Sequence, residues 1–450
     1  MYAILLEARS AEWYNEHESM QTNCFRTEML YYNPGGRSLQ EKICAGELIP
    51  QEATMAAITP PKYVRQVLVT LQGRGYPAFL VGGCVRDMVL GVQPHDWDIC
   101  TAALPEQILE LFPGAKLTGG RTGTVTVRVN SHPVEVTPFR TESRYTDHRH
   151  PDQVRFVADL TADLSRRDFT VNAMALSPDG MVSDPFGGLA DLRRGVIRCV
   201  GEPERRFEED ALRMLRALRF SARLGFSIEL FTMEAIREKA PLCAALAPER
   251  IREELEKILL SQGPEKALEA VELGLLDAYL QSRLPPEVPE DLSLLPRRVP
   301  DRWAGYAWLL ERYGCVPAAG AFLKALRLDS RSIHVSEQTA AVLNAPLPET
   351  AAEWKRCLRR RGIEASVCAA RCADAFALGE GKARGVKAVL KSGECFSLRQ
   401  LAVTGEDLMA LGLQGRALGE MLDFLLDYVI DYPENNRREL LLSLAGGSEE

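Results

Sequence analysis

Residues 79–101, FLVGGCVRDMVLGVQPHDWDICT, decide the fold of this chain. The run Phe79–Val81 is short and apolar, so it predicts a buried strand, and Gly82-Gly83 end that strand. Apolar residues at helical spacing follow in 84–90 and predict a short helix that closes at a glycine. His95–Cys100 then predicts a second strand. The stretch therefore indicates a strand–turn–helix–strand unit.

Two carboxylates share one face of the second predicted strand. Because side chains alternate along a strand, Asp96 and Asp98 point the same way, while Trp97 and Ile99 point into the core. The two carboxylates are about 7 Å apart along the strand. Beside a strand-Gly-Gly-helix turn, this pattern predicts a site for a divalent metal and a triphosphate. The alternative is a solvated face of an edge strand.

A third carboxylate is expected to join them. Arg121–Val129 and His132–Arg140 alternate like paired strands joined at Asn130-Ser131. On the second of these strands, Glu135 faces away from its valine neighbours, which places it to complete the acidic site. The alternative is an exposed strand glutamate.

The remaining chain falls into segments of different character. Residues 1–55 are polar and without periodicity, and we expect them to be a disordered extension or to precede the true start. From 56, a proline-initiated helix leads into the first strand. Thr141–Phe156 is polar and breaks both periods, so it predicts a loop. After about residue 194 almost every segment predicts helix.

Composition excludes several classes of protein. The chain has 450 residues, of which 46% are hydrophobic and 26% charged, as in ordinary globular proteins. It has no apolar run of membrane-spanning length, and its first residues are too short and too acidic to predict a signal peptide, so we expect no membrane contact. Eleven cysteines without C-x-x-C pairs indicate reduced thiols and a cytoplasmic location. A net charge of −8 argues against indiscriminate nucleic-acid binding, so any nucleic-acid site is expected in a locally basic segment.

One such segment runs from residue 355 to 391 and contains ten Lys/Arg but only three acidic residues. We interpret it as a candidate track for an RNA backbone. The alternative is a solvated helix surface. The residues chosen as RNA contacts are Lys355, Arg356, Arg359, Arg360 and Arg361.

A base-reading pair is suggested by the predicted helix Phe207–Phe226. Asp210 and Arg213 are three residues apart and would be neighbours on its surface. A carboxylate accepts from an exocyclic amine and a guanidinium donates to a ring acceptor, so the pair suits cytosine and adenine. Guanine or uracil would place an acceptor against Asp210, at a cost of about 1–3 kcal/mol. The alternative is an intrahelical salt bridge.

The motifs together resemble a known family. GGCVRD with HDWD, VEVTPFR, RRDFTVNA, DPFGGLADL and EEDALRMLRALRF stand in the order found in class II tRNA nucleotidyltransferases, the CCA-adding enzymes. These form a branch, with bacterial poly(A) polymerases, of the DNA polymerase beta-like nucleotidyltransferases. The resemblance implies an α+β fold, in which a mixed-sheet head flanked by helices precedes an all-α remainder. The expected parts are a catalytic head (56–194), a base-selecting neck (195–260), a helical body (261–360) and a tRNA-binding tail (361–450).

The resemblance also implies roles for named residues. Asp96 and Asp98 would hold Mg²⁺, with Glu135 as a third catalytic carboxylate. The other candidates are nucleotide-binding residues. They are Gly83, Arg86, Arg167, Asp210, Arg213, Arg216 and Arg219. The implied partners are CTP, ATP and the acceptor arm of tRNA.

Several activities remain open at this point. The segment after the acidic strand is GGRTGTVTV rather than an arginine-rich GRRF-type run, which favours a tRNA enzyme over a poly(A) polymerase. The polar loop Tyr145–Val154 is the counterpart of a flexible loop that CC-only enzymes lack, so we expect full CCA addition. CC-only addition, A-only addition and a catalytically dead RNA-binding relative are the alternatives. The oligomeric state is left open.

Overall fold

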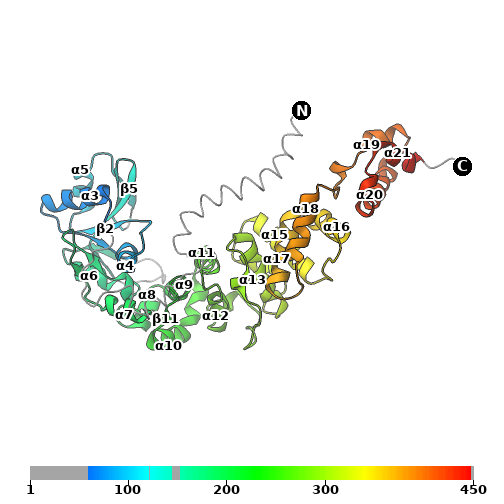
Figure 1. Cartoon of the computed structure of the whole chain (residues 1–450). Coiled ribbons are helices and arrows are strands. Elements are labelled where there is room, and N and C mark those ends of the chain that lie inside the picture. The colour runs from blue at the N-terminus through cyan, green and yellow to red at the C-terminus, as the bar shows by residue number, and fades with distance from the viewer. Residues whose placement is uncertain (1–58, 121, 144–152, 447–450) are drawn as a thin grey trace. The chain divides into compact units, whose positions relative to one another are not determined.

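The computed structural model describes residues 59–120, 122–143 and 153–446 (Figure 1). These fall into two compact units. The first comprises the described residues up to Asp210 together with Leu224–Met233; the second comprises Ala211–Arg223 and the described residues from Glu234 onward. The predicted extension at 1–55 and most of the loop at 145–154 lie outside the described residues.

The first unit is built on a seven-stranded mixed sheet, as the sequence predicts. Only β2 and β5 run parallel to one another; the other neighbouring strands in this sheet are antiparallel. In sheet order the strands are β3 (Lys116–Gly119), β4 (Thr124–Val129), β5 (His132–Pro138), β2 (Asp98–Thr101), β1 (Ala78–Val81), β8 (Ala175–Leu176) and β9 (Val182–Ser183). The parallel pair puts two strands that are far apart in sequence at the centre of the sheet.

Amphipathic helices cover this sheet. In α3 (Lys62–Gly73) the side chains of Val64, Val67, Leu68 and Leu71 are buried, at the spacing of one helical face. Burying each of these side chains contributes about 1.5–3 kcal/mol. The other helices of the unit are α4 (Gly83–Val89), α5 (Pro105–Leu111), α6 (Leu160–Ser165), α7 (Gly188–Arg194) and α8 (Pro203–Glu209).

The predicted hairpin of β4 and β5 is confirmed. Asn130 and Ser131 adopt φ of 49° and 68°, the left-handed pair that a two-residue turn with the right twist requires. Val125 pairs with Val136 across the hairpin, and both are fully buried. Glu135 consequently faces the other side of the sheet, where it is exposed.

Two predicted boundaries are wrong in detail. The second strand was expected from His95, but β2 begins at Asp98, and His95 and Asp96 form a bend before it. Trp97 is buried and Asp96 exposed, so the alternation of faces holds although the ladder has not begun. Thr141–Phe156 was expected to be a loop, but β6 (Arg140–Ser143) pairs antiparallel with β7 (Gln153–Phe156). Backbone pairing here overrides a polar sequence that lacks strand periodicity.

The predicted continuous helix at 207–226 is also wrong. Helix α8 ends at Glu209, Asp210 has an extended backbone (φ −146°, ψ 103°), and α9 (Leu212–Leu224) starts anew. Aspartate is a poor residue for a helix interior because its side chain competes for backbone groups. The apolar stripe of α9 is as predicted, with Leu215 and Leu218 fully buried. A short parallel pair, β10 (Val196–Ile197) and β11 (Ser227–Ile228), flanks this break in the sequence.

The described residues of the second unit form helices and connecting loops without strands, as expected. Besides α9 and the part of α10 (Leu230–Lys239) from Glu234 onward, its longer elements are α11 (Pro248–Leu259), α12 (Lys266–Glu272), α13 (Val299–Arg312), α14 (Ala319–Ala325), α15 (Ser330–Leu343), α16 (Ala351–Arg361), α17 (Ile363–Ala375), α18 (Lys382–Ser392), α19 (Gly405–Ala410), α20 (Gly415–Asp431) and α21 (Arg438–Gly446). None of the helices in the described ranges has the length and apolar character needed to cross a membrane.

The cores of these helices do not follow the predicted division at residue 360. Trp354 and Leu358 of α16, Val367 of α17, and Val386 and Val389 of α18 form one buried cluster, which the predicted boundary would cut. A separate cluster lies under α19–α21. It contains Leu408, Leu425, Leu426, Val429 and Leu441. Packing therefore groups α16–α18 together and places the next change of core after α18.

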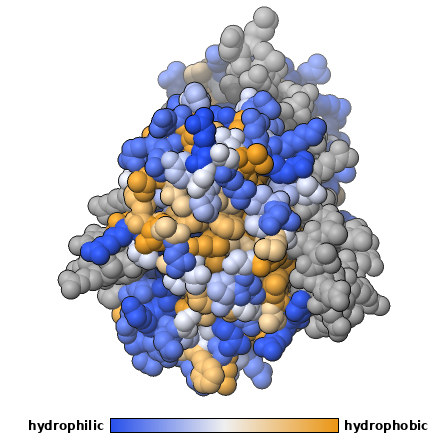
Figure 2. Space-filling model, turned by 90° about the vertical axis from the view of Figure 1, so that its left-hand side faces the viewer, coloured by the Kyte–Doolittle hydropathy of each residue, from blue (hydrophilic) through white to orange (hydrophobic). Residues whose placement is uncertain are grey.

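Some large apolar side chains remain at the surface. Figure 2 shows one face on which hydrophobic patches alternate with hydrophilic ones. Among the described residues, Met181 is 69% exposed, Phe231 65% and Val69 63%. Folded proteins commonly expose single apolar side chains, so these need no partner to explain them.

Candidate active site

The turn after β1 depends on glycine. Gly82 has φ 74° and ψ −135°, a backbone conformation that side chains with a Cβ rarely adopt. A methyl group added there would also lie 2.9 Å from Nη1 of Arg167. Gly83 then begins α4, whose Val85 and Met88 are buried as predicted. The turn thus allows the chain to reverse while a guanidinium lies against its backbone.

The sheet brings the predicted carboxylates to one place. Asp98 is the first residue of β2, and the parallel register pairs it with Glu135 of β5. Asp96 lies two residues before Asp98, and Trp97 between them is buried. Sequence alternation predicts that each carboxylate faces away from the core, and the register decides that they share one edge of the site. Their catalytic roles stay a prediction.

The electrostatics of Asp98 reflect this convergence. Burial, opposed by the charge of Arg167 and reinforced by repulsion from Glu135 and Asp96, raises the pKa of Asp98 to about 6. A cation placed among these oxygens would remove the repulsion and favour the ionised form. Carboxylates are also the ligands that a hard divalent cation prefers. The donor set therefore fits a divalent metal.

The carboxylates do not form a closed metal cage by themselves. Within the described ranges, no group of three or more His, Cys, Asp or Glu side chains could hold a metal ion. Like charges repel one another, so close approach of three carboxylates needs a cation between them. Mg²⁺ commonly takes one or two carboxylates and completes its shell with phosphate oxygens and water, so an open arrangement suits it.

Arg86 was expected to contact phosphate, but the structure buries it. Its side chain is 3% exposed, and its Nε and Nη2 donate to Asp87 Oδ1 at 2.9 and 2.7 Å. Its Nη1 donates to Asn172 Oδ1 at 2.7 Å, which ties α4 to the turn η2 (Thr170–Asn172). The guanidinium is committed to partners inside the protein, so its position favours a structural role over direct phosphate binding.

Arg167, in contrast, lies at the site. Its Nη1 is next to Gly82, and its charge acts on Asp98. Its Nη2 pairs with Asp163, a fully buried residue that the sequence analysis did not single out. The available signal was helical spacing, since Asp163 stands three and four residues before Arg166 and Arg167.

The predicted base-reading residues do not lie on one helix. Asp210 belongs to the first unit and stands where the chain passes to the second, whereas Arg213 is 8% exposed in α9 of the second unit. Arg219 forms an ion pair with Glu254 at 2.7 Å, and its Cζ lies 4.4 Å from the centre of the Phe220 ring. The helical i,i+3 argument for Asp210 and Arg213 therefore fails, and their role in base selection stays a prediction.

The predicted RNA contacts on α16 are largely engaged within the second unit. Lys355 is 1% exposed, donates to the carbonyl of Ile430 at 3.2 Å and pairs with Glu394 at 2.6 Å. A buried lysine cannot face RNA, so this prediction is wrong for Lys355. Its burial supports the packing of α16 against α20.

Acidic residues of α20 neutralise the neighbouring arginines. Arg356 pairs with Asp431 at 2.6 Å, while Arg359 pairs with Asp427 at 3.1 Å and also with Asp423. Arg361 donates to Gln338 at 3.0 Å. Arg360 is exposed and makes no ion pair with the described residues. Two of the five predicted RNA contacts, Arg356 and Arg359, are therefore balanced by α20, which lies 64–75 residues further along the chain.

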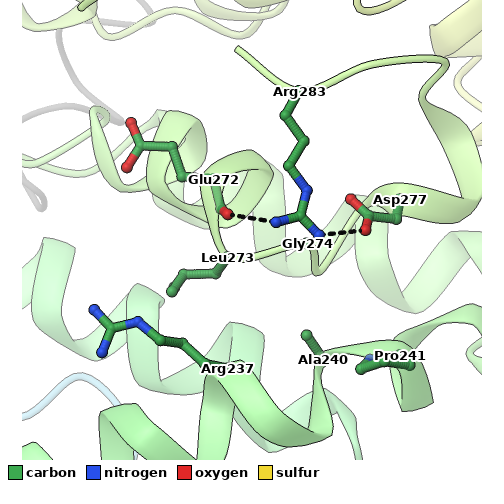
Figure 3. Close-up of a pocket in the computed structure, with 8 residues that line it drawn as sticks. All are labelled: Arg237, Ala240, Pro241, Glu272, Leu273, Gly274, Asp277 and Arg283. Carbon is green, nitrogen blue, oxygen red and sulfur yellow. Dashed lines mark hydrogen bonds and ion pairs between the residues drawn. The ribbon is translucent and has the colours of Figure 1, made fainter. Parts of the chain in front are cut away.

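A cavity of about 250 Å³ lies in the second unit (Figure 3). Arg283 donates to the carbonyl of Glu272 at 3.3 Å and to Asp277 at 2.7 Å, and Arg237 of α10 also lines the cavity. Two arginines and two acidic residues leave the lining without a net charge. None of the residues predicted for nucleotide or RNA binding lines this cavity.

Comparison with known proteins covers most of the chain. The family described as "Poly A polymerase head domain" matches residues 78–198, and that described as "Probable RNA and SrmB- binding site of polymerase A" matches 225–288. A CCA-adding enzyme of Lactiplantibacillus plantarum is 37% identical over 397 residues, which are 85% of this chain and 95% of that protein. One from Geobacillus sp. is 39% identical over 356 residues, 76% of this chain and 85% of that protein.

Solved structures give the same grouping. A Bacillus stearothermophilus CCA-adding enzyme in complex with CTP has a TM-score of 0.72 at 32% identity, covering 86% of this chain and 97% of that one. A Thermotoga maritima CCA-adding enzyme complexed with tRNA has a TM-score of 0.61 at 21% identity, covering 92% and 99%. The second likeness concerns the fold alone.

Proposed function

The chain belongs to the family of CCA-adding enzymes, and from this we propose that it adds C, C and A to the 3′ end of tRNA, using CTP and ATP without a template. One observation of the structure carries this proposal. The parallel register of β2 and β5 sets Asp98 beside Glu135, next to the Gly82-Gly83 turn. The family match to the head covers all of these residues.

The reaction needs a 3′-hydroxyl held in line with the α-phosphorus of a nucleoside triphosphate. Asp96 and Asp98 would hold Mg²⁺, and Glu135 would complete the acidic site. When bound there, the cation would neutralise charge at the triphosphate and lower the pKa of the attacking hydroxyl. The raised pKa of Asp98 supports this assignment, because burial, together with repulsion from Glu135 and Asp96, disfavours its ionised form, and a bound cation would offset both effects.

Phosphate and base are held by different residues. Gly83 lets the backbone approach the triphosphate, and Arg167 donates to it from beside the Gly82 turn. Asp210 and Arg213 read the Watson–Crick edge shared by cytosine and adenine, and Arg216 and Arg219 line the nucleotide. Replacing Asp210 by Ala lowers the preference for CTP and ATP over UTP and GTP by about 10–100-fold. Misincorporation assays with each nucleotide alone measure it, and unchanged selectivity would remove Asp210 from this role.

The division of labour follows the parts of the chain. The first unit carries the chemistry, and the helices from α9 onward hold the acceptor arm of tRNA. We place the protein in the cytoplasm, which is supported by free thiols at each cysteine within the described residues.

A chain that adds only CC or only A, or polymerises A, is the second candidate. The segment GGRTG before β4 favours the tRNA enzyme. The decisive experiment offers labelled CTP, ATP, GTP or UTP to tRNA transcripts ending at the discriminator base, after C and after CC. Three added nucleotides and a stop establish CCA addition. Two additions indicate a CC-only enzyme, a long ATP ladder a poly(A) polymerase, and no product an inactive relative.

A further inference from the structure

Asp163 is the most heavily engaged buried carboxylate near the active site. It lies on α6 with its side chain fully buried. It accepts from Arg166 Nη2 at 2.8 Å, from Arg167 Nη2 at 3.2 Å and from the backbone N–H of Arg140 at 3.2 Å. Burial alone would raise the pKa of Asp163, but the charges of Arg166 and Arg167 outweigh it and hold the pKa below its ordinary value. The residue is therefore a fixed anion.

The guanidinium of Arg167 is held by Asp163 through Nη2, whereas its Nε has no partner within the described part of the chain. Nη2 of Arg167 donates to Asp163. The backbone carbonyl of Arg167 accepts from Nη2 of Arg206 at 2.9 Å, which fixes the backbone at this residue. Its Nε is buried and has no hydrogen-bond partner among the described residues. Its Nη1 lies against the Gly82 turn. A buried donor without a partner is costly unless a ligand satisfies it, so Nε points to a bound oxyanion, and Nη1 lies beside the glycine turn where that oxyanion would be held.

We propose that Asp163 is a positioning residue for nucleotide binding: it orients Arg167 so that Nε and Nη1 face the triphosphate at the Gly82-Gly83 turn. The identity of the ligand rests on the proposed function. A free arginine would lose conformational freedom when it binds phosphate, and Asp163 removes that loss by ordering the side chain beforehand. The charge of Asp163 also keeps Arg167 from pairing instead with Asp98, whose carboxylate is then free for the cation.

The test is a double-mutant cycle between Asp163→Asn and Arg167→Ala. Asparagine keeps the size of the side chain and one acceptor but removes the charge. We expect Asp163→Asn to weaken CTP binding and lower kcat/KM for CTP by about 10–100-fold, the range for a charged hydrogen bond. In the Arg167→Ala background the same change should alter either value less than about twofold. Equal losses in both backgrounds would mean that Asp163 acts through Arg166 and Arg140, and would overturn the proposal.

Controls separate positioning from folding. Asp159→Asn, at the N-cap of the same helix, removes an exposed charge but keeps the side-chain oxygen that accepts from the backbone of Thr161 at 2.9 Å, and it should leave CTP affinity unchanged. Thermal unfolding is measured for each variant. If Asp163→Asn does not fold, Arg167→Lys decides, because lysine can pair with Asp163 but lacks the second donor edge. Wild-type CTP affinity and kcat in Arg167→Lys would overturn the proposal.

The readouts also separate this proposal from the proposed function. CTP affinity is measured by direct titration without tRNA, so the cycle can be completed in binding alone. A wild-type protein that binds CTP but transfers no nucleotide refutes the proposed function and leaves the cycle to decide on Asp163. A wild-type protein that binds neither CTP nor ATP overturns both.

Discussion

Two concentrations of charge stand out in the sequence, and the structure treats them in opposite ways. The basic residues of α16 meet the aspartates of α20, so Arg356 and Arg359 are neutralised within the fold. The carboxylates of the sheet meet one another, and Asp98 shares its register position with Glu135. Paired charge supports packing, whereas charge that the protein leaves unbalanced marks the place where a ligand of opposite charge is needed. Charge density alone does not distinguish the two.

The largest effect is expected at the acidic site. Replacing Asp98 by Ala should lower the rate of CMP addition at least about 1,000-fold, because several kcal/mol of charge stabilisation by the cation are lost. Affinity for tRNA, measured by filter binding, should stay within about threefold of wild type. Appreciable turnover by Asp98→Ala would show that the acidic site is not the metal site.

The charge of Asp98, although it is needed for the metal site, should lower the stability of the folded protein. The pKa of Asp98 is about 6 in the folded protein, against an ordinary value of 3.8. Its ionisation therefore lowers the free energy of unfolding progressively as pH rises from about 4 through 6. Asp98→Asn should therefore raise the free energy of unfolding by about 2–3 kcal/mol at pH 7.5 without metal. Urea unfolding at pH 7.5 and at pH 4 checks this, since the gain should vanish at the lower pH. A loss of stability at pH 7.5 would contradict the unbalanced charge.

Protons and metal should compete at this site. Below the pKa of about 6, Asp98 becomes protonated and no longer serves as a ligand. Below pH 6 the apparent affinity for Mg²⁺ should fall with decreasing pH, approaching a loss of about tenfold for each pH unit. Above pH 7 the affinity should be constant. Titrations of activity with Mg²⁺ at several pH values measure this, and saturating Mg²⁺ should move the acid limb to lower pH. A pH-independent affinity between 5 and 6 would exclude Asp98 as a ligand.

The smallest effect is expected at α16. Arg359→Gln removes pairs with Asp423 and Asp427, and exposed pairs contribute about 0.2–1 kcal/mol each. Stability should fall by about 1 kcal/mol, less at high salt, with tRNA affinity unchanged. Arg360→Gln is the matched control and should leave stability as it is. If Arg359→Gln instead weakens tRNA binding at constant stability, the RNA track predicted from the sequence is right and the pairing with α20 is incidental.

The sequence predicts the first unit well because its signals are local. Alternation along 96–99 and 134–136 places each carboxylate opposite a buried side chain, and the Asn130-Ser131 turn fixes the register of the hairpin. The pattern also predicts the helical second unit. It fails where a partner distant in the chain decides the outcome. The sequence predicts that Arg86 donates to a ligand. In the structure it donates instead to Asn172, which lies 86 residues away in the chain.

The sequence by itself determined the mixed-sheet head, the helical remainder and the candidate residues for catalysis, because periodicity and motif order are properties of neighbouring residues. Tertiary structure alone decided which of those charges are free. It buried Lys355, broke the helix at Asp210, and set Asp163 under Arg167. The physical reason is that ion pairing depends on the distance between two charges in space. Spacing along the sequence does not predict that β2 pairs with β5 or that α16 packs against α20.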